Sequence, residues 1–274
     1  GLLQIGYPLG WAIASLWAMW ILPIYGWRAL FLVGLLSLPL ILVVSKWVRE
    51  PPRYKAAKDQ LSPRPIRELF SASMRHRTII LFSAQFLFVW AYSASIFLFP
   101  SYLREFRGME AFDFALVIGA GNAIGILGYI LAAWVGEYLL SRRNTVVIWT
   151  VIGAVLFELM IWTTESFWEI LAVYSFMSMF FYGSAAVKFA YLAEVFPTYI
   201  RSTAMTFCGS GAVVVLGSAA GPYCVSLAVE QWGWTLGYAT LVGVPLLMAG
   251  LLYLALMPIP SGLEVEDIEN YFNR

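Results

Sequence analysis

The stretch "YGSAAVKFAYLAEVFPTYIRS", residues 182–202, begins as an apolar helix and ends in a charged turn. Lys188 lies inside the apolar part, and Glu194, Pro197 and Arg201 follow in that order. A lysine at the centre of a membrane helix costs about 2.5–3.5 kcal/mol, so its presence here calls for a physical reason. Proline ends a helix because it lacks an amide hydrogen and clashes with a preceding carbonyl. The stretch therefore predicts a membrane span that stops after Glu194 and a new helix that starts near Arg201.

The composition of the whole chain excludes an ordinary soluble protein. The chain has 274 residues, of which 61% are hydrophobic and only 12% are charged, whereas a soluble domain is about half apolar and about a quarter charged. Twelve Trp and fifteen Tyr suit the two interfaces of a bilayer. The net charge of +1 argues against a strongly basic nucleic-acid binder. Two cysteines in one apolar stretch indicate neither a disulfide framework nor a metal site. We predict an integral membrane protein and expect no cofactor.

Apolar runs between charged residues predict an all-α chain that crosses the membrane eight times. A helical span needs about 20 apolar residues, and the sequence lacks the alternating ten-residue segments of a membrane β-barrel. The predicted spans are residues 5–25, 29–48, 78–103, 114–140, 145–162, 168–195, 202–229 and 234–257.

The distribution of Lys and Arg predicts which side of the membrane each loop faces. Eight spans place both termini on one side, and that side carries thirteen Lys and Arg, nine of them in the 46–77 loop. The other side carries three. Because cytoplasmic loops are rich in Lys and Arg, we expect this loop and the C-terminus to be cytoplasmic, in a multi-pass protein of the plasma (inner) membrane.

Two stretches resemble each other and indicate an internal repeat. The stretch "YGWRALFLVG" at 25–34 opens the second span, and "WGWTLGYATLVG" at 232–243 opens the eighth. A proline follows each stretch, at Pro39 and at Pro245. Parallel repeats of this length are typical of secondary transporters built from two halves. Chance similarity between apolar helices is the alternative.

The repeat predicts how the chain is organised, if one repeat unit has six spans. We expect the last two helices of an incomplete N-terminal bundle at 1–48 and a cytoplasmic linker between the bundles at 49–77. A complete six-helix C-terminal bundle at 78–257 and a cytoplasmic tail at 258–274 follow. Four further spans are expected before Gly1, and without them the chain is not expected to transport.

Four short motifs carry a family resemblance. "GWR" at 26–28 with "REPPRY" at 49–54 resembles the end of a first bundle, and "LFPSYL" at 98–103 a helix exit that contains proline. "AEVFPTYIRSTA" at 193–204 resembles an acid–proline–arginine motif between helices ten and eleven, and "WVGEYLLSRRN" at 134–144 a degenerate inter-helix motif. Together they resemble the major facilitator superfamily from its fifth to its twelfth helix. The branch of sugar porters and aromatic-acid or metabolite proton symporters is the most similar.

The resemblance implies transport by alternating access, and it gives a role to charges at the cytoplasmic helix ends. It implies a network that holds an inner gate shut and that consists of Glu137, Arg142, Arg143, Glu194 and Arg201. The alternative is that these are interfacial charges that only set the topology, worth up to about 1 kcal/mol per pair.

Lys188 lies six residues before Glu194, roughly 9 Å deep at 1.5 Å per residue. It is a cation that faces a central cavity, a lysine whose side chain snorkels to the cytoplasm, or half of a structural ion pair. Ser184 shares its helical face and suits the border of an aqueous cavity. Glu158 lies about 10 Å further from the cytoplasm, and we expect it to reach the outer interface instead.

Uncharged polar residues mark two further helix faces. Gln85 and Tyr92 lie seven residues apart in the third span, and Asn122 and Tyr129 repeat that spacing in the fourth. Such groups line a substrate pathway, or they form hydrogen bonds between helices that are worth about 0.6 kcal/mol on average.

Glycines in the first and fourth spans have the spacing that lets helices approach closely. In the superfamily these two spans meet across the two bundles. We therefore expect sliding contacts there, at Gly6, Gly10, Gly121, Gly125 and Gly128.

These inferences predict a secondary active transporter of a small metabolite, with an organic anion favoured and with proton coupling. The predicted substrate pathway comprises Gln85, Tyr92, Asn122, Tyr129, Ser184 and Lys188. A sugar or polyol transporter of the same fold and a non-transporting membrane sensor are the alternatives.

Two other classes of membrane protein are disfavoured. The single histidine, His76, lies in a basic stretch without a carboxylate spaced to orient it, which argues against a membrane enzyme. The sequence has no filter loop or charge ring of a channel. We expect a monomer whose partners are a small-molecule substrate, protons and membrane lipid, with no nucleic acid.

Overall fold

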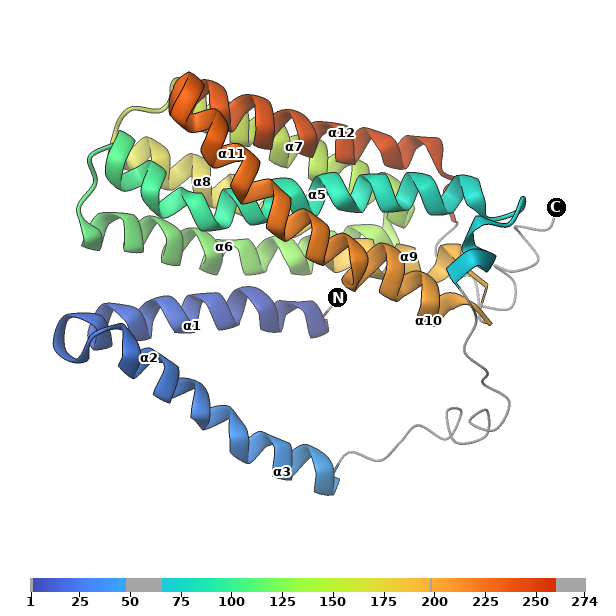
Figure 1. Ribbon diagram of the computed structural model, residues 1–274, viewed down its shortest axis with the longest axis horizontal. Coiled ribbons are helices and arrows are strands. Elements are labelled where there is room, and N and C mark those ends of the chain that lie inside the picture. Colours follow the sequence, from blue (N-terminus) through green and yellow to red (C-terminus); the bar gives the residue numbers. More distant parts are fainter. Residues whose placement is uncertain (1, 48–65, 198, 260–274) are drawn as a thin grey trace.

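The computed structural model describes residues 2–47, 66–197 and 199–259 (Figure 1). All regular elements in these residues are helical, which confirms the all-α prediction for the described part of the chain. Within it, six helical segments are long and apolar enough to cross a membrane, namely Trp27–Trp47, Arg75–Phe106, Phe112–Tyr138, Arg142–Thr163, Phe167–Val195 and Arg201–Ala255. Most of the predicted linker and tail, residues 49–65 and 260–274, lies outside the described residues.

The predicted spans correspond to these segments within a few residues. Five of the predictions each fall on one segment, and Arg201–Ala255 covers the last two predicted spans. Figure 1 shows that this segment reverses direction between its first and second halves. The first predicted span falls on helix α1, Leu2–Tyr25, whose residues Leu9–Ala18 form a shorter apolar stretch. The total of eight spans stays a prediction.

Each of the two repeated stretches contains a turn of the same backbone conformation. Gly26 has φ 70° and ψ 176°, and Gly233 has φ 80° and ψ 168°. Residues other than glycine rarely adopt this region of backbone conformation. The glycine of the Gly-Trp dipeptide in each stretch therefore makes the turn that joins two helices running in opposite directions. The first turn joins α1 to α2, Trp27–Gly34. The repeat in the sequence is therefore also a repeat of backbone conformation.

Each of these turns is followed by a helix that becomes irregular just before its proline. A 3₁₀ segment, Leu35–Ser37, precedes Pro39 and leads into α3, Leu38–Trp47. A π-helical segment, Ala239–Gly243, precedes Pro245. Proline removes one hydrogen-bond donor and crowds the carbonyl four residues before it, so the local helix changes its hydrogen bonding.

The remaining helices form one bundle. A 3₁₀ turn, Ile66–Phe70, enters it, and Thr78 donates a hydrogen bond of 2.8 Å to the carbonyl of Leu69. Helix α5 packs against α11 and α12, and α8 packs against α6 and α7. Helix α1 lies along α6, as the family resemblance implies, while α3 extends away from the bundle (Figure 1). The bundle comprises α5 (Arg75–Ser101) with a π-helical extension (Tyr102–Phe106), α6 (Ala111–Tyr138), α7 (Arg142–Thr163), α8 (Phe167–Phe181), α9 (Ala185–Val195), α10 (Arg201–Ala204) with the π-helical Met205–Ser210, α11 (Ala212–Tyr238), α12 (Val244–Leu252) and the 3₁₀ turn Tyr253–Ala255.

Serine side chains set the starts of two helices. Ser166 accepts a hydrogen bond from the amide of Glu169, whose carboxylate accepts from the amide of Ser166 in return. This reciprocal capping box satisfies two amides that the first turn leaves unpaired, and α8 begins there. Ser141 accepts from the amide of Asn144 at the start of α7. A serine cap thus makes the tight turn in the degenerate "WVGEYLLSRRN" motif.

The glycines of α6 have a different role from the predicted one. A Cβ atom on Gly121 or Gly125 would meet Tyr174 or Ser178 of α8, and one on Gly128 would lie 2.7 Å from the Cα atom of Met179. By contrast, a Cβ atom on Gly6 or Gly10 of α1 would meet nothing within 4 Å. The prediction that these glycines form a sliding contact between α1 and α6 is therefore wrong. The α6 glycines bring α6 and α8 together within one bundle.

We expect Gly128→Ala to lower the free energy of unfolding by about 1–3 kcal/mol, the usual cost of overpacking a close contact. The added methyl group would overlap the backbone of Met179, which cannot move aside as a flexible side chain does. Thermal unfolding in detergent measures the effect.

Gly119→Ala is the matched control on the same helix, because a Cβ atom there meets nothing within 4 Å. It should be neutral or slightly stabilising, since Ala favours helices over Gly by about 1 kcal/mol. Equal effects of the two substitutions would contradict the assigned packing.

Candidate functional site

The helical segment Phe167–Val195 is interrupted in its middle. Helix α8 ends at Phe181, a turn covers Tyr182–Ser184, and α9 starts at Ala185. Gly183 makes the turn possible, because a Cβ atom there would lie 2.7 Å from the carbonyl carbon of Gly128 on α6. Breaks of this kind inside membrane spans are typical of the substrate and ion sites of transporters.

Lys188 lies in the first turn of α9, directly after this break. Its side chain is only 2% exposed, and its Nζ atom lies over the ring of Phe88 on α5. Within the described residues it forms no ion pair with a carboxylate. A cation over an aromatic face gains about 2 kcal/mol when it is desolvated, but the ring carries no counter-charge. The ammonium is thus buried beside an aromatic ring and has no negative partner in this part of the chain.

Aromatic side chains extend from Lys188 along α5 and α8. The ring centroids of Phe88 and Phe181 are 5.3 Å apart, and those of Tyr92 and Tyr182 are also 5.3 Å apart. Phe88 and Tyr92 lie one turn apart on α5, so they share a helix face. The result is an aromatic wall that continues from the ammonium toward the middle of the bundle.

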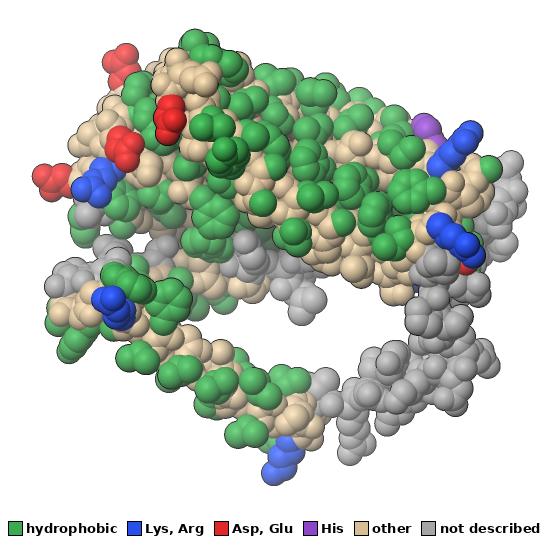
Figure 2. Space-filling view, in the orientation of Figure 1, with side chains coloured by type: hydrophobic (Ala, Val, Ile, Leu, Met, Phe, Trp, Pro, Cys, Tyr) green, Lys and Arg blue, Asp and Glu red, His purple; other side chains and the backbone are tan. Residues whose placement is uncertain are grey.

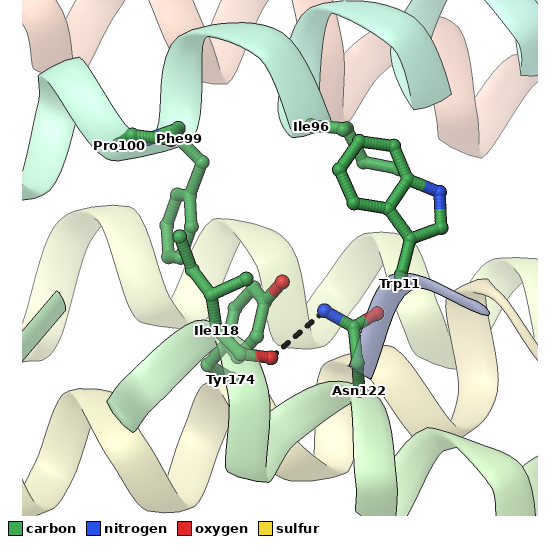
Figure 3. A pocket seen from close by; sticks show the side chains of 7 residues that line it. All are labelled: Trp11, Ile96, Phe99, Pro100, Ile118, Asn122 and Tyr174. Carbon is green, nitrogen blue, oxygen red and sulfur yellow. Dashed lines mark hydrogen bonds between the residues drawn. The ribbon is translucent and has the colours of Figure 1, made fainter. Parts of the chain in front are cut away.

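A pocket of about 160 Å³ lies further along this face. Figure 3 shows Trp11 and Tyr174 on its two sides, with Asn122 between them. Asn122 donates a hydrogen bond of 2.8 Å to the carbonyl of Ile118. The rings of Phe99 and Tyr174 stack with their centroids 4.5 Å apart. The lining residues are Trp11, Ile96, Phe99, Pro100, Ile118, Asn122 and Tyr174, from α1, α5, α6 and α8.

Helix α5 contacts both the pocket and the ammonium of Lys188. Phe88, whose ring contacts the ammonium of Lys188, precedes the pocket residue Ile96 on α5 by eight residues, or about 12 Å of helix. Lys188 does not line the pocket, whose one amide group is that of Asn122. An apolar pocket with one polar group suits a largely apolar ligand, and a negative charge on an elongated ligand could reach the separate buried cation.

The other predicted pathway residues are buried at different places in the bundle. Gln85 is 2% exposed, and its Oε1 atom lacks a hydrogen-bond partner within the described residues. It shares the α5 face of Phe88 and lies one turn away. Tyr129 is 3% exposed on α6. Ser184 is fully buried in the break and donates a hydrogen bond of 2.7 Å to the carbonyl of Phe181. The structure thus places Gln85, Tyr92, Ser184 and Lys188 around the break and Asn122 in the pocket.

The two ends of the bundle differ in charge. On the face in Figure 2, Lys and Arg side chains lie beside the single His at one end, and most of the visible Asp and Glu side chains lie at the opposite end, together with a basic side chain. The acidic end carries exposed carboxylates at Glu105, Glu110, Glu165, Glu169 and Glu230. We call the other end, where Arg142 begins α7, the basic end.

Three of the five predicted gate residues meet at the basic end. Arg142 forms an ion pair of 2.6 Å with Glu137, and its other terminal nitrogen pairs with Glu194. These contacts join the last turn of α6, the first turn of α7 and the last turn of α9. The Glu194 and Arg142 side chains are 19% and 21% exposed, whereas Glu137 is 45% exposed.

The other two predicted gate residues contact backbone carbonyls. Arg143 donates a hydrogen bond of 2.7 Å to the carbonyl of Leu256, and Arg201 donates one of 3.4 Å to that of Phe196. Each helix end leaves four carbonyls without a partner in the helix, and a guanidinium with five donors suits them. Neither arginine joins an ion pair within the described residues.

Two residues of this end were missed by the sequence analysis. Arg77 donates a hydrogen bond of 2.8 Å to the carbonyl of Val195, and Tyr191 donates one of 2.8 Å to that of Met257. The first bond links α9 to α5, and the second links α9 to the chain after the last helical turn. Tyr191 lies three residues after Lys188, and its Tyr-x-x-Glu spacing to Glu194 was the available signal for one functional helix face.

The described residues offer no metal site. They contain no group of three or more His, Cys, Asp or Glu side chains able to hold a metal ion. The site therefore consists of a buried cation, an aromatic wall and a pocket, and the helix-end contacts lie at the basic end.

Comparison with known proteins identifies the family. The model of the Major Facilitator Superfamily matches residues 1–143, which is more than half of the chain. The chain belongs to the Major Facilitator Superfamily. The resemblance predicted from the four motifs is thereby confirmed.

Curated relatives of this superfamily member are transporters. It is 28% identical over 261 residues to the cis,cis-muconate transport protein of Acinetobacter baylyi (strain ATCC 33305 / BD413 / ADP1), covering 88% of this chain and 59% of that protein. It is 25% identical to the putative niacin/nicotinamide transporter of Bacillus subtilis (strain 168), covering 80% and 54%. It is 26% identical to the citrate-proton symporter of Salmonella typhi, covering 80% and 52%. This chain thus spans between half and two thirds of the length of these relatives.

We expect the Arg142–Glu194 pair of this superfamily member to be energetically coupled. A double-mutant cycle with Arg142→Gln and Glu194→Gln should give a coupling of about 0.5–3 kcal/mol in the free energy of unfolding, the range for residues in contact. The reason is that both side chains are about four-fifths buried and belong to different helices. Denaturant unfolding in mixed micelles measures it.

The matched cycle uses Arg142→Gln with Glu137→Gln. Because Glu137 is 45% exposed and precedes Arg142 by five residues, its coupling should be below about 1 kcal/mol. A cycle in which Glu137 couples more strongly than Glu194 would refute the assignment.

Proposed function

We propose that this chain is part of a secondary active transporter that moves a small organic anion across a membrane by alternating access, coupled to protons. Membership in the Major Facilitator Superfamily supports the mechanism. The substrate class and the coupling are supported by its relatives, which include a cis,cis-muconate transport protein, a putative niacin/nicotinamide transporter and a citrate-proton symporter. No covalent chemistry is part of the proposal, and the protein is not an enzyme.

The buried ammonium of Lys188 is the observation that carries the anion proposal. It lies next to a break in a membrane span, and no carboxylate of the described residues neutralises it. A carboxylate on a substrate supplies the missing charge and accepts a charge-assisted hydrogen bond. The aromatic wall and the pocket with Asn122 then hold the apolar, planar part of the substrate.

We further propose the topology that this function requires. The chain crosses a plasma (inner) membrane eight times as a multi-pass protein, with its basic end and its C-terminus in the cytoplasm. Residues 1–48 contribute two helices of one half and residues 78–257 form the other half. Residues 49–77 link the two halves, and residues 258–274 form the tail. The excess of basic residues at one end supports this orientation. The transporter works as a monomer.

The contacts at the basic end act as the inner gate in this proposal. Arg142, Glu137 and Glu194 hold the ends of α6, α7 and α9 together, and opening toward the cytoplasm separates or rearranges them. Their free energy biases the equilibrium between the two transporter states.

Lys188→Met is expected to raise the KM for an anionic substrate about 10- to 100-fold. A hydrogen bond to a charged group is worth about 1.5–3 kcal/mol, and each 1.4 kcal/mol is about tenfold in affinity. Uptake of radiolabelled cis,cis-muconate, nicotinate and citrate into vesicles that contain the natural full-length protein measures this. Glucose uptake in the same vesicles tests the sugar alternative.

Lys46→Met is the matched control, because Lys46 is an exposed cation at the end of α3. It should leave the KM unchanged. An unaltered KM in Lys188→Met would remove Lys188 from the substrate site. Absence of uptake for every anion, with binding retained, would favour the sensor over the transporter.

A further inference from the structure

The last membrane segment, Gly233–Ala255, is irregular around Pro245. Because Pro245 has no amide hydrogen, the carbonyl of Leu241 loses its donor within the helix. The indole nitrogen of Trp90 on α5 donates a hydrogen bond of 2.8 Å to this carbonyl instead. The preceding residues Ala239–Gly243 form a π-helical segment. Single π-helical turns inside α-helices often mark functional positions.

Glu158 on α7 lies against this π-helical segment. A Cβ atom on Gly243 would overlap the Oε1 atom of Glu158. The other carboxylate oxygen, Oε2, accepts a hydrogen bond of 2.9 Å from the indole nitrogen of Trp162. Oε1 itself is buried and has no hydrogen-bond partner within the described residues. The expectation that Glu158 simply reaches the outer interface does not account for this buried oxygen.

Charged and titratable side chains on the neighbouring elements contact groups other than Glu158. Lys188 on α9 lies over the ring of Phe88, and the hydroxyl of Tyr253 has no hydrogen-bond partner within the described residues. Arg107, after the π-helical extension of α5, donates to the hydroxyl of Tyr102 and to the carbonyl of Ile161. Tyr238 on α11 donates to the carbonyl of Ala94, and Tyr174 on α8 stacks on Phe99. Glu169 on α8 accepts from two backbone amides. Residues 239–252 contain no titratable side chain. Within the described residues, no cation neutralises Glu158.

We propose that Glu158 is a proton-binding site inside the membrane and that its protonated carboxyl group binds the π-helical segment of the last span. A hydronium ion transfers a proton to Oε1, so that its own O–H bond breaks and a water molecule remains, and in the reverse step the proton returns to water. In the protonated state the O–H group donates to a backbone carbonyl of Ala239–Gly243. In the ionised state the bare oxygen repels these carbonyls.

The surroundings of Glu158 favour a bound proton. An ionised carboxylate deep in a membrane helix is costly unless it is paired, and Glu158 lies about 7.5 Å from the end of α7 at Thr163. A proton removes the charge and turns an unpaired acceptor into a donor. The π-helical segment next to it supplies the acceptors, since its carbonyls are not all used in the regular α-helical pattern.

This inference goes beyond the proposed function, because it needs no substrate and names one proton-binding residue. The result of its test can therefore be distinguished from a failure of the anion-transport proposal. If uptake of every anion fails but the Glu158 test succeeds, the proton site stands without the substrate assignment.

The test is labelling of the natural full-length protein in lipid nanodiscs at pH 7 with dicyclohexylcarbodiimide, an apolar reagent that reacts with protonated carboxyl groups. Peptide mass spectrometry locates the modified residues. We expect Glu158 to be labelled at least 10-fold more than Glu165, an exposed glutamate in the loop after the same helix. Labelling of Glu158 should decrease as the pH is raised. Equal labelling of both residues, or none at Glu158, overturns the proposal.

Hydrogen exchange tests the link to the last span. After correction for the intrinsic pH dependence, the amides of residues 239–248 should be better protected at low pH than at high pH. In Glu158→Gln, whose neutral amide is a permanent donor, protection should stay high at both. A pH-dependent change that persists in Glu158→Gln contradicts the proposal.

Gly243→Ala is a second variant that leaves the carboxyl group in place. The added methyl group occupies the space of Oε1, so labelling of Glu158 should change at least threefold. Gly250→Ala is the matched control on the same helix, because its Cβ atom would meet Thr150 and Val151 instead. Equal effects of the two substitutions on labelling would show that only general packing is involved, and the proposal would fall.

Discussion

The absence of water inside a bilayer is the constraint on which this structure depends, because every buried backbone carbonyl needs a donor from the protein itself. In the described spans, side chains donate to backbone carbonyls at places where regular hydrogen bonding is interrupted or where two helices lie close together. Pro245 frees the carbonyl of Leu241, and Trp90 supplies the donor from another helix. Ser178 donates to the carbonyl of Gly121, and Ser93 to that of Gly217, where glycines bring two backbones together. Many polar side chains in these spans therefore serve the backbone.

Several buried polar groups are exceptions. The ammonium of Lys188 has no ionic partner in the described residues, and six buried side-chain atoms have no hydrogen-bond partner there. They are Oε1 of Gln85 and of Glu158, Nε1 of Trp149, Oγ1 of Thr150, Nε of Arg201 and the hydroxyl of Tyr253. Buried groups of this kind are costly unless something else supplies the partner. A transporter presents such groups to a substrate or a proton, since a partner that comes and goes cannot be replaced by a permanent one. The exceptions are thus better evidence for function than the satisfied serines and asparagines.

The sequence predicted the helices of this chain because apolar length and charge placement are local properties. The stop after Glu194, the caps near Ser141 and Ser166 and the turns at Gly26 and Gly233 all follow from neighbouring residues. The partners across the bundle do not. The glycines of α6 were assigned to α1 because the period of a helix shows which residues share a face but not which helix that face meets.

The charged residues show the same limit. The Arg142–Glu194 pair joins positions 52 residues apart in the sequence, and only the family resemblance suggested it. Arg143 and Arg201 instead bind helix-end carbonyls, whose positions follow from packing. The pocket around Asn122 combines residues from four helices. No sequence pattern predicted this pocket, and Asn122 was the only sign of it in the sequence.

Helix α9 connects the two parts of the candidate site. It has 11 residues, about 16 Å of rise, and the break at Tyr182–Ser184 separates it from α8. Its first turn carries Lys188, and its last turn carries Glu194 and the carbonyl of Val195. Under the proposed function, an anion that draws the ammonium away from Phe88 also moves the other end of α9, because a short helix is stiff along its length. That end holds Arg142, Arg77 and, through Tyr191, the chain after the last span. Under the proposed function, substrate binding and the inner gate are therefore linked by one rigid element, and the break before Lys188 is what allows that element to move separately from the rest of its span.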